Sequence, residues 1–348
     1  MTTLSSGRGR ATMVDVARRA NVSIKTVSRV VNGEDGVRPE TAESVQAAIQ
    51  DLGFRRNAGA RQLRRGPTAS IGLVVEDLAD PYYSALAAAC ERVARERDHV
   101  LITGSAEGSP AREESVVDVL LSRQVDGLLI VPAGAECPWL TPEIATRTPA
   151  VFIDRPVRDV AADLVVTDNE GGIASAVDHL AQSGHRRIGF LGDDETLWTA
   201  QQRRRGFMTA TASMDASCQQ HIAMGPHDVG RLTSVLRRWL HEHQPISALV
   251  TGNNRVTVAT LRALRELADA RFHVQVMGFD DFELADVVDP PVSVVAQDPA
   301  QIGAAAAELL FARLSGDRSA PRTVTMPTRL VTRDQRTASR GAGSEPPP

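Results

Sequence analysis

The feature that most constrains the fold is the alternation of short apolar runs with amphipathic stretches from Ser70 onward. The apolar runs predict strands over residues 71–75, 100–103, 127–131, 150–153, 164–167, 188–191, 248–251 and 274–277. The amphipathic stretches predict helices, among them residues 82–95, 171–182, 231–240, 256–267 and 302–314. Such alternation predicts parallel sheets with helices on both faces, and ligands of these sheets bind at the carboxyl ends of the strands. No internal repeat of about 20–50 residues is visible.

Ahead of this region, residues 14–33 (VDVARRANVSIKTVSRVVNG) have the pattern of a helix-turn-helix. The first helix is expected to make its apolar contacts through three residues, Val14, Ala17 and Ala20. Residues 21–23 predict a tight turn, and Ser23 can cap a second helix over residues 24–31. A third helix is expected over residues 39–52, with Pro39 in its first turn and Gly53 after its end. Its inner stripe is predicted to be Val45, Ala48, Ile49 and Leu52.

On the second helix, Val27, Val30 and Val31 recur at helical spacing and should face inward. Four residues should then face outward, where a recognition helix meets base edges in the major groove: Ile24, Lys25, Ser28 and Arg29. This pattern indicates DNA binding. A short amphipathic segment with a serine cap also occurs in other helical proteins, so the motif alone leaves that alternative open.

The charge distribution favours the DNA-binding interpretation. Residues 1–66 hold 12 Lys and Arg against 6 Asp and Glu, a net charge of +6, so residues 67–348 of this −4 chain carry −10. Lys25 is the only lysine beside 38 arginines. A basic unit attached to an acidic body suits phosphate neutralisation, which supplies most non-specific DNA affinity.

Length and composition indicate a small head and a body of two domains, since 348 residues exceed one domain. No apolar run approaches the roughly 18 residues of a membrane span, and the N-terminal residues do not resemble a secretory signal. We therefore expect a cytoplasmic protein that has no membrane partner. Cys90, Cys137 and Cys218 are too few and too far apart for a disulfide framework or a zinc pattern. Each is interpreted as a small apolar core residue.

Several motifs occur in an order that resembles the lactose-repressor (LacI/GalR) family of bacterial transcription regulators over residues 12–333. The segment VDVARRANVSIKTVSRVVNG resembles the family's DNA-binding head, and Asn57, Ala60 and Leu63 resemble its hinge. The following segments resemble the family's ligand-binding core: IGLVVEDLADPYY, VFIDR, DNEGG, GHRRIGFLGD, RRRGF, VTGNN, VMGFDD and PPVSVVAQD. The resemblance implies an all-α helix-turn-helix head and a periplasmic-binding-protein-like core of two doubly wound parallel-sheet lobes.

The expected organisation is a disordered N-terminus (residues 1–11), a helix-turn-helix DNA-binding domain (12–56), a hinge helix or linker (57–66), a two-lobed effector-binding and dimerisation core (67–336) and a tail (337–348) whose Gly, Ser and Pro content predicts disorder. The implied partners are a pseudo-palindromic operator, a second copy of the chain and a small effector, most simply a carbohydrate. Ile24, Lys25 and Arg29 would contact bases. Ser23, Thr26 and Thr41 would contact phosphates, and Leu63 would enter the minor groove as a wedge.

The resemblance also implies an effector site between the lobes. Asp154 would accept effector hydroxyls, Arg203 would grip the effector, and Asn253 and Asp280 would act from the second lobe. The loop from Asp80 to Tyr83 would close over the ligand, with Tyr82, Tyr83 or Trp198 covering the apolar face of a pyranose. Each residue has a structural alternative: the aspartates could cap turns, Arg203 could lie on the surface, Trp198 could pack a loop, and the tyrosines could belong to the core.

The chain departs from the family pattern at a few positions. Arg204 and Arg205 stand where small apolar residues are usual, Asp193 replaces a glycine, and Asn254 replaces an aspartate. In the hinge, Arg56 replaces a proline, and Gly59 lowers helix stability by about 1 kcal/mol relative to alanine.

Other functions remain open at this stage. The effector could be a non-sugar corepressor such as a nucleobase. An enzyme acting on sugars is a further alternative, although no Walker P-loop, HExxH or nucleophile-elbow motif is present. The sequence indicates neither a cofactor nor a metal, because the spacing of His241, Glu242 and His243 does not suit a joint metal site. The basic head argues against a stand-alone solute-binding protein.

Overall fold

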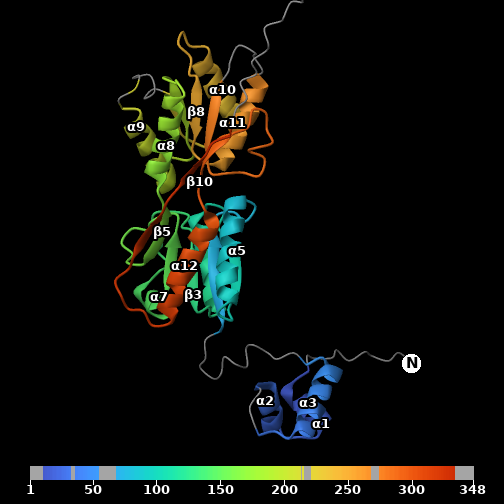
Figure 1. Ribbon diagram of the computed structural model, residues 1–348. Helices are drawn as coiled ribbons and strands as arrows, with labels where there is room; N and C mark the ends of the chain where they lie inside the picture. Colours follow the sequence, from blue (N-terminus) through green and yellow to red (C-terminus); the bar gives the residue numbers. More distant parts are fainter. Residues whose placement is uncertain are drawn as a thin grey trace, which may run out of the picture. The chain divides into compact units, whose positions relative to one another are not determined.

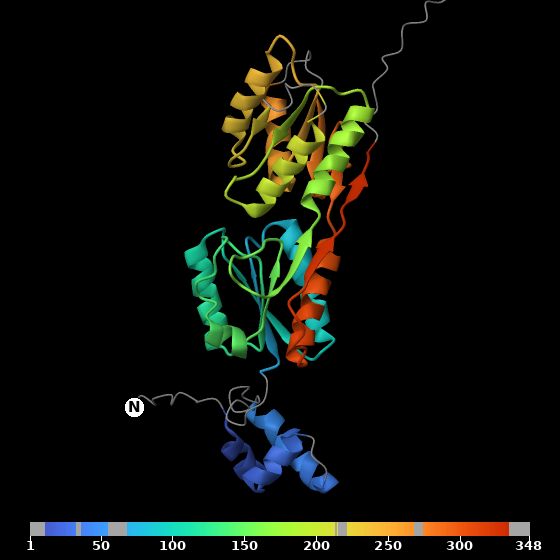
Figure 2. The same ribbon diagram turned by 90° about the vertical axis from the view of Figure 1, so that its left-hand side faces the viewer.

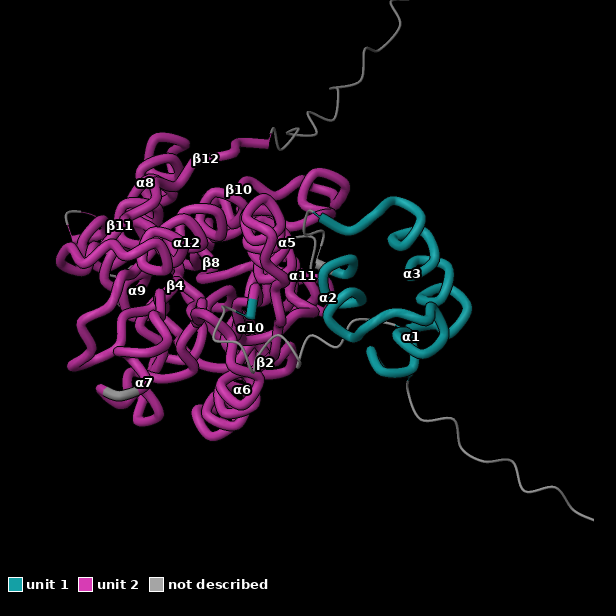
Figure 3. Tube along the Cα trace, turned by 90° about the horizontal axis from the view of Figure 1, so that it is seen from below, with its two compact units in different colours: residues 1–68 teal, residues 69–348 magenta. Residues whose placement is uncertain are grey.

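The computed structural model describes residues 11–32, 36–54, 68–212, 214, 221–267 and 274–333. It divides into two compact units, residues 1–68 and 69–348, which are described separately (Figure 3). The predictions for residues 1–10, for the hinge residues Arg56, Asn57, Gly59, Ala60 and Leu63, for Cys218 and for the tail from Thr337 lie outside the described residues.

The described residues of the first unit form three short helices, α1 (Met13–Ala20), α2 (Ile24–Asn32) and α3 (Pro39–Leu52). Thr12 and Asp15 form a capping box at the start of α1. Ser23 Oγ accepts the Thr26 N–H at the start of α2, as predicted. Gly53 ends α3 with a left-handed φ of 59°, which a glycine adopts without strain.

The small core of this unit consists of Val16, Ala17, Val27, Val45 and Ala48. The prediction that Val14 faces this core is wrong, because Val14 is 47% exposed and Val16 is fully buried instead. Since α1 begins at Met13, the residues of one face are spaced from Met13 through Val16 and Ala17 to Ala20, and Val14 lies on the opposite side. Leu52, at the last position of α3, is also exposed.

The second unit begins with an N-terminal lobe built on a six-stranded parallel sheet. Its strands are β1 (Ser70–Val75), β2 (Val100–Ser105), β3 (Gly127–Ile130), β4 (Ala150–Ile153), β5 (Asp163–Thr167) and β11 (Thr323–Met326), in the order β11-β5-β4-β3-β1-β2. Helices α5 (Pro81–Arg95) and α12 (Pro299–Leu314) cover one face, and α6 (Pro110–Ser122) covers the other. A short helix, α7 (Pro142–Arg147), precedes β4.

The C-terminal lobe repeats this strand order. Its strands are β6 (Ile188–Leu191), β7 (Ile222–Ala223), β8 (Ala248–Thr251), β9 (Gln275–Phe279), β10 (Ser293–Ala296) and β12 (Arg329–Val331), in the order β12-β10-β9-β8-β6-β7. Only β12 runs antiparallel to its neighbour in this sheet. Helices α8 (Asn169–Gln182) and α9 (Trp198–Ala210) cover one face, and α10 (Val229–Leu240) and α11 (Asn254–Leu267) cover the other.

Three crossovers join the lobes (Figures 1 and 2). β5 leads from the N-terminal lobe into α8, β10 leads back into α12, and β11 leads into β12. The carboxyl ends of both sheets therefore meet where the chain crosses. The described part of the chain contains no helix with the length and hydropathy of a membrane span.

All eight predicted strands are present, with ends within about two residues of the predicted ones. β7, β10, β11 and β12 were not predicted. β11 and β12 are outer strands in which exposed and half-buried residues alternate, and β7 has two residues, so none carries a long apolar run. β10 is fully buried, and its four residues lie within the motif PPVSVVAQD.

Candidate functional site

The second helix of the first unit carries exposed residues above a buried one. Ile24 is 50% exposed and Lys25 is exposed, whereas Val27 is fully buried. Ser28 and Arg29 are half-buried, and the Arg29 guanidinium lies close to Gly36. An exposed apolar residue beside a lysine at the start of such a helix matches a groove that presents thymine methyl groups next to hydrogen-bond acceptors.

The hydroxyl groups predicted to contact phosphates lie at the beginnings of helices. Ser23 Oγ lies 2.9 Å from Thr26 Oγ1, so these two hydroxyls are hydrogen-bonded to each other. Thr41 is in the first turn of α3 and is half-buried. The first turn of a helix presents free N–H groups, which are suited to phosphate oxygens.

A cavity of about 290 Å³ lies at the carboxyl ends of the strands in the second unit and is lined from both lobes. This volume is at the low end of the usual range for small-molecule sites. Of the eight residues predicted to bind a ligand, seven line it: Asp80, Tyr82, Tyr83, Asp154, Arg203, Asn253 and Asp280. Trp198 does not, although its neighbours Leu197 and Thr199 do. Trp198 is half-buried at the start of α9.

Two aspartates enter the cavity from equivalent positions of the two lobes. Asp154 follows β4 and Asp280 follows β9, with φ of 73° and 67°. Each donates its backbone N–H to the neighbouring strand, to Val165 O at 2.8 Å and to Val295 O at 2.9 Å respectively. Aspartate tolerates this left-handed conformation better than most residues. The same backbone turn therefore delivers one carboxylate from each lobe.

Asp154 is held by the residue that follows it. Arg155 Nε lies 3.1 Å from Asp154 Oδ2, and Arg155 Nη2 bonds to Glu76 and, at 3.2 Å, to the Tyr83 hydroxyl. Arg155 Nη1 donates to Pro132 O at 3.1 Å. Each guanidinium nitrogen therefore has an oxygen partner, while Asp154 Oδ1 has no hydrogen-bond donor among the described residues.

Asp280 is held through a glutamine at the crossover. Gln297 Nε2 donates to Asp280 Oδ1 at 2.6 Å, and Gln297 Oε1 accepts from the Thr167 hydroxyl and, at 3.5 Å, from Tyr82. Burial raises the pKa of Asp280 above its ordinary value, against the opposing effect of Arg203 and of the Gln297 hydrogen bond. Burial also raises the pKa of Tyr82 and of Tyr83, so both remain neutral hydroxyls.

Arg203 is fixed in the C-terminal lobe. Its Nε donates to Asn169 Oδ1 at 2.7 Å, and its Nη1 donates to Gly252 O at 2.6 Å and lies 3.9 Å from Asp280 Oδ2. The guanidinium stacks on the Phe279 ring at 3.9 Å. Nη2 has no partner among the described residues, so one donor nitrogen remains for a ligand.

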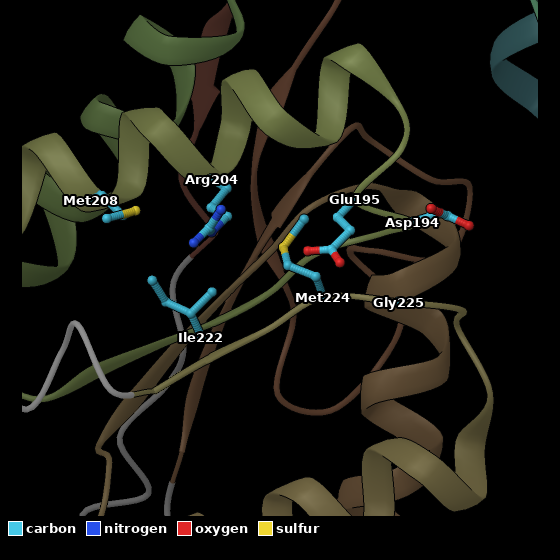
Figure 4. A pocket seen from close by; sticks show the side chains of 7 residues that line it. All are labelled: Asp194, Glu195, Arg204, Met208, Ile222, Met224 and Gly225. Carbon is cyan, nitrogen blue, oxygen red and sulfur yellow. The ribbon is translucent and has the colours of Figure 1, made fainter. Parts of the chain in front are cut away.

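The unusual arginines after Arg203 do not disturb the packing of α9. Arg204 and Arg205 are exposed, and Arg205 pairs with Glu170 at 3.2 Å. Gly206 is the residue that faces α8, where a Cβ would lie 2.7 Å from Glu170 O. Arg204 instead borders a separate cavity of about 520 Å³ between α9 and β7, together with Met208, Ile222 and Met224 (Figure 4). None of the predicted ligand residues lines that cavity.

Contacts across the mouth of the first cavity connect the lobes directly. Asp80, the N-cap of α5, accepts from Asn254 Nδ2 at 2.9 Å and lies 3.3 Å from Arg255 Nε. Arg255 also bonds to Asp77. The Ala79 N–H and the hydrogen bond from Arg255 hold the pKa of Asp77 below its ordinary value. In the C-terminal lobe, Asn253 Nδ2 donates to Asp193 Oδ2 at 2.6 Å.

Sequence reasoning missed several residues that build this site: Glu76, Arg155, Asp193, Asn254, Arg255 and Gln297. Asn254 and Asp193 were noticed only as departures from the family pattern. Gln297 follows β10, a strand that the sequence did not predict, so the sequence placed no strand end at Gln297. Arg155 adjoins a predicted residue, and its role depends on contacts with Glu76 and Tyr83 that are distant in the sequence.

Comparisons with known proteins agree with this architecture. The model of bacterial regulatory proteins of the lacI family matches residues 12–57, and the periplasmic binding protein-like domain model matches residues 177–334. The HTH-type transcriptional regulator PtxS of Pseudomonas plecoglossicida is 30% identical over 336 residues, which cover 95% of this chain and 97% of that protein. The ribose operon repressor of Haemophilus influenzae is 28% identical, covering 93% and 98%.

Among solved structures, the complex of the transcriptional regulator CelR with cellobiose is 28% identical, with a TM-score of 0.68, covering 94% of this chain and 100% of that one. The lac repressor dimer bound to operator and the anti-inducer ONPF shares the fold, with a TM-score of 0.79 at 24% identity, covering 93% and 98%. With its helix-turn-helix head and two-lobed periplasmic-binding-like core, this chain belongs to the lacI family of bacterial regulatory proteins.

Proposed function

We propose that this chain is a transcriptional repressor whose affinity for its operator is controlled by a polyhydroxylated effector in the cavity between the lobes. One observation carries the proposal: a helix-turn-helix unit shares its chain with a cavity in which both lobes supply polar atoms that have no partner among the described residues. A ligand that uses both sets of atoms binds best at one separation of the lobes, and such differential binding is what shifts a conformational equilibrium.

The polar atoms of the cavity match the hydroxyl groups of a sugar. Asp154 and Asp280 each offer a carboxylate oxygen as an acceptor, and Arg203 offers a donor nitrogen. Tyr82 and Tyr83, whose rings meet edge to face at 5.1 Å, provide an apolar surface next to them. Relatives named as a ribose operon repressor and as a cellobiose complex support a sugar effector.

On DNA, two copies of the chain would bind the half-sites of a pseudo-palindrome, because the symmetry of a dimer matches that of its operator. Ile24, Lys25 and Arg29 would contact bases, and an arginine paired with a guanine is worth about 1–3 kcal/mol of discrimination. Leu63 would enter the minor groove of a bent duplex. The short hinge helix would fold only on the operator.

Effector binding would change the angle between the lobes and thereby the pairing of the two hinges. A coupling of about 1–3 kcal/mol changes operator affinity about 5–150-fold. We propose an inducer, which loosens the hinges, since the polar groups resemble a sugar-binding set.

The test combines DNA binding with a ligand screen. Purified protein is titrated with palindromes from upstream of its own locus, at several salt concentrations, with and without monosaccharides and disaccharides. We expect specific binding that one sugar weakens, and we expect Arg203→Ala to keep the DNA binding and lose the sugar response. Arg204→Ala, the exposed neighbour, should keep both. Failure to bind any of these palindromes, with or without sugars, would overturn the proposal.

Leu63→Ala tests the hinge separately. This variant should weaken operator binding far more than binding to unrelated DNA. Equal losses on both would remove Leu63 from the mechanism.

A further inference from the structure

The charged side chains around the cavity are strongly unequal in sign. Six carboxylates line it: Glu76, Asp80, Asp154, Asp193, Asp194 and Asp280. Three guanidinium groups line it: Arg155, Arg203 and Arg255. The carboxylates therefore exceed the guanidinium groups by three. With Asp280 protonated, and with the exposed His227 at the edge charged, one excess negative charge still remains.

Most of the positive charge is already paired within the protein. Arg155 donates from all three guanidinium nitrogens to protein oxygens. Arg255 is held between Asp77 and Asp80. Only Arg203 is both buried and left with a donor nitrogen free of partners among the described residues. One nitrogen is a poor match for a carboxylate or a phosphate, which are usually bound by paired donors.

The unpaired acceptors are buried within the same cavity. Only 6% of the Asp154 side chain and 10% of the Asp280 side chain are exposed. Asp154 Oδ1 has no donor among the described residues, and the nearest cation to Asp280 Oδ2 is Arg203 at 3.9 Å. Buried carboxylate oxygens need hydrogen-bond donors or positive charge from a ligand, and the carboxylate or phosphate group of an anionic sugar supplies neither.

The N-terminus of α9 opposes this charge. α9 has no side-chain cap, and Leu197, Thr199 and Ala200 at its N-terminus line the cavity, so its free N–H groups add about half a positive charge there. Asp193 and Asp194, in the loop before this helix, place two carboxylates beside the same end. The helix dipole therefore reduces the excess negative charge without reversing it.

From this imbalance we propose that the effector is an uncharged or amino-substituted sugar, and that the cavity excludes sugar acids and sugar phosphates. The inference rests on the proposed function and names the chemical class of its ligand. Hydroxyl or ammonium hydrogens would bond to Asp154 and Asp280, and a hydroxyl or ring oxygen would accept from Arg203.

Isothermal titration calorimetry with the full chain tests this on ring-matched series. Glucose is compared with glucosamine, glucuronate and glucose 6-phosphate, and galactose and ribose are compared with their own derivatives. For any parent sugar that binds, we expect its acid and its phosphate to bind at least about tenfold more weakly at low salt. The amino derivative should bind at least as tightly as the parent. Added salt should reduce these differences in affinity, because salt screens the charges.

Two variants distinguish the effect of the cavity's charge on ligand selectivity from the effect of its shape. Asp193→Asn removes one negative charge from the cavity and keeps a side-chain oxygen that accepts from Asn253. The affinities of the sugar acid and of its parent sugar should therefore differ less in this variant. Glu91→Gln removes the same charge from an exposed position of α5 and should leave that difference unchanged. An acid or phosphate that binds as tightly as its parent would overturn the inference and leave the proposed function standing. If no sugar binds, either in this series or in the screen of monosaccharides and disaccharides, the sugar-effector function fails and the inference fails with it.

Discussion

Asp154 and Asp280 occupy equivalent turns of the two lobes, yet their neighbours hold them by different chemistry. In the N-terminal lobe, the adjacent Arg155 pairs with Asp154 directly. In the C-terminal lobe, the amide of Gln297 binds Asp280, and the guanidinium of Arg203 stays 3.9 Å away. The repeated strand order fixes where a carboxylate enters the cavity, and the surrounding side chains decide how much of its charge is neutralised.

A second pair of equivalent positions shows the same contrast. Asp163 begins β5 and accepts the backbone N–H of Arg322, just before the last strand of its sheet. Ser293 begins β10 and accepts the backbone N–H of Arg333, just after the last strand of the other sheet. Both residues anchor an outer strand, one with a carboxylate and one with a hydroxyl. Substitutions of Asp154, Asp280, Asp163 and Ser293 test this comparison, because they should change the free energy of unfolding by different amounts.

The largest effect is expected from Asp163→Asn. The Asp163 side chain is 1% exposed and binds Arg313 of α12 through both oxygens, at 2.7 and 2.8 Å. Removing one charge of a buried pair costs about 3–5 kcal/mol. The free energy of unfolding, measured by denaturant titration, should fall by about 3 kcal/mol. Asp317→Asn removes a more exposed charge beside the same Arg313 and should cost less than about 1 kcal/mol. Equal losses of unfolding free energy in the two variants would contradict the interpretation of Asp163 and Arg313 as a buried ion pair.

This pair also predicts a pH dependence. Burial raises the pKa of Asp163, but the hydrogen bonds from Arg313 and from the Arg322 amide outweigh it, and the pKa lies below its ordinary value of 3.8. A lowered pKa contributes stability above the ordinary value, and this contribution disappears as the pH falls through the lowered pKa. The difference in unfolding free energy between the protein and Asp163→Asn should therefore shrink below about pH 4. A difference independent of pH would argue against the ion pair.

The sequence predicted the fold more completely than it predicted the site. The eight predicted strands and the turn residues Ser23 and Gly53 follow from local chemistry, because apolar runs and capping residues act within a few positions of themselves. Seven predicted ligand residues line one cavity, and all of them except Arg203, which lies within α9, follow a strand end or stand at the start of a helix. The role of Gln297 could not be read in this way, since it depends on Asp280, Thr167 and Tyr82 meeting at the crossover.

The next prediction compares the free energies of unfolding of Asp280→Asn and Asp154→Asn. Because burial raises the pKa of Asp280, its ionised form costs stability as the pH rises through that pKa. Asp280→Asn should therefore leave the unfolding free energy at pH 7 unchanged or raise it by up to about 1 kcal/mol. Asp154→Asn weakens the charged hydrogen bond from Arg155 and should cost about 1–2 kcal/mol. Denaturant titration at pH 7 compares the two, and a larger loss for Asp280→Asn would contradict the contrast between the lobes.

Ser293→Ala should have a smaller effect. The Ser293 hydroxyl accepts from Arg333 N at 2.9 Å and donates to Arg333 O at 3.3 Å. A neutral hydrogen bond contributes about 1 kcal/mol to stability, so the loss should be roughly a third of that for Asp163→Asn, and it should not vary with pH near 4. A loss as large as that of Asp163→Asn would show that the anchoring of the outer strands does not depend on charge.

An effect of about the same size as that of Ser293→Ala, but on the separation of the lobes, is expected where the two lobes meet. Asn254 donates to Asp80 from the opposite lobe, so Asn254→Asp places two carboxylates together and replaces an attraction by a repulsion. Arg255 lies beside both and offsets part of that repulsion, so we expect about 1 kcal/mol against the joined arrangement. Small-angle X-ray scattering should detect a larger separation of the lobes, and the affinity for the effector should fall about fivefold. Asn254→Ala removes the hydrogen bond without adding a charge and should have an intermediate effect. If the aspartate and alanine variants behave alike, the contact between the lobes depends on the hydrogen bond alone, and the acidic excess of the cavity does not extend to its mouth.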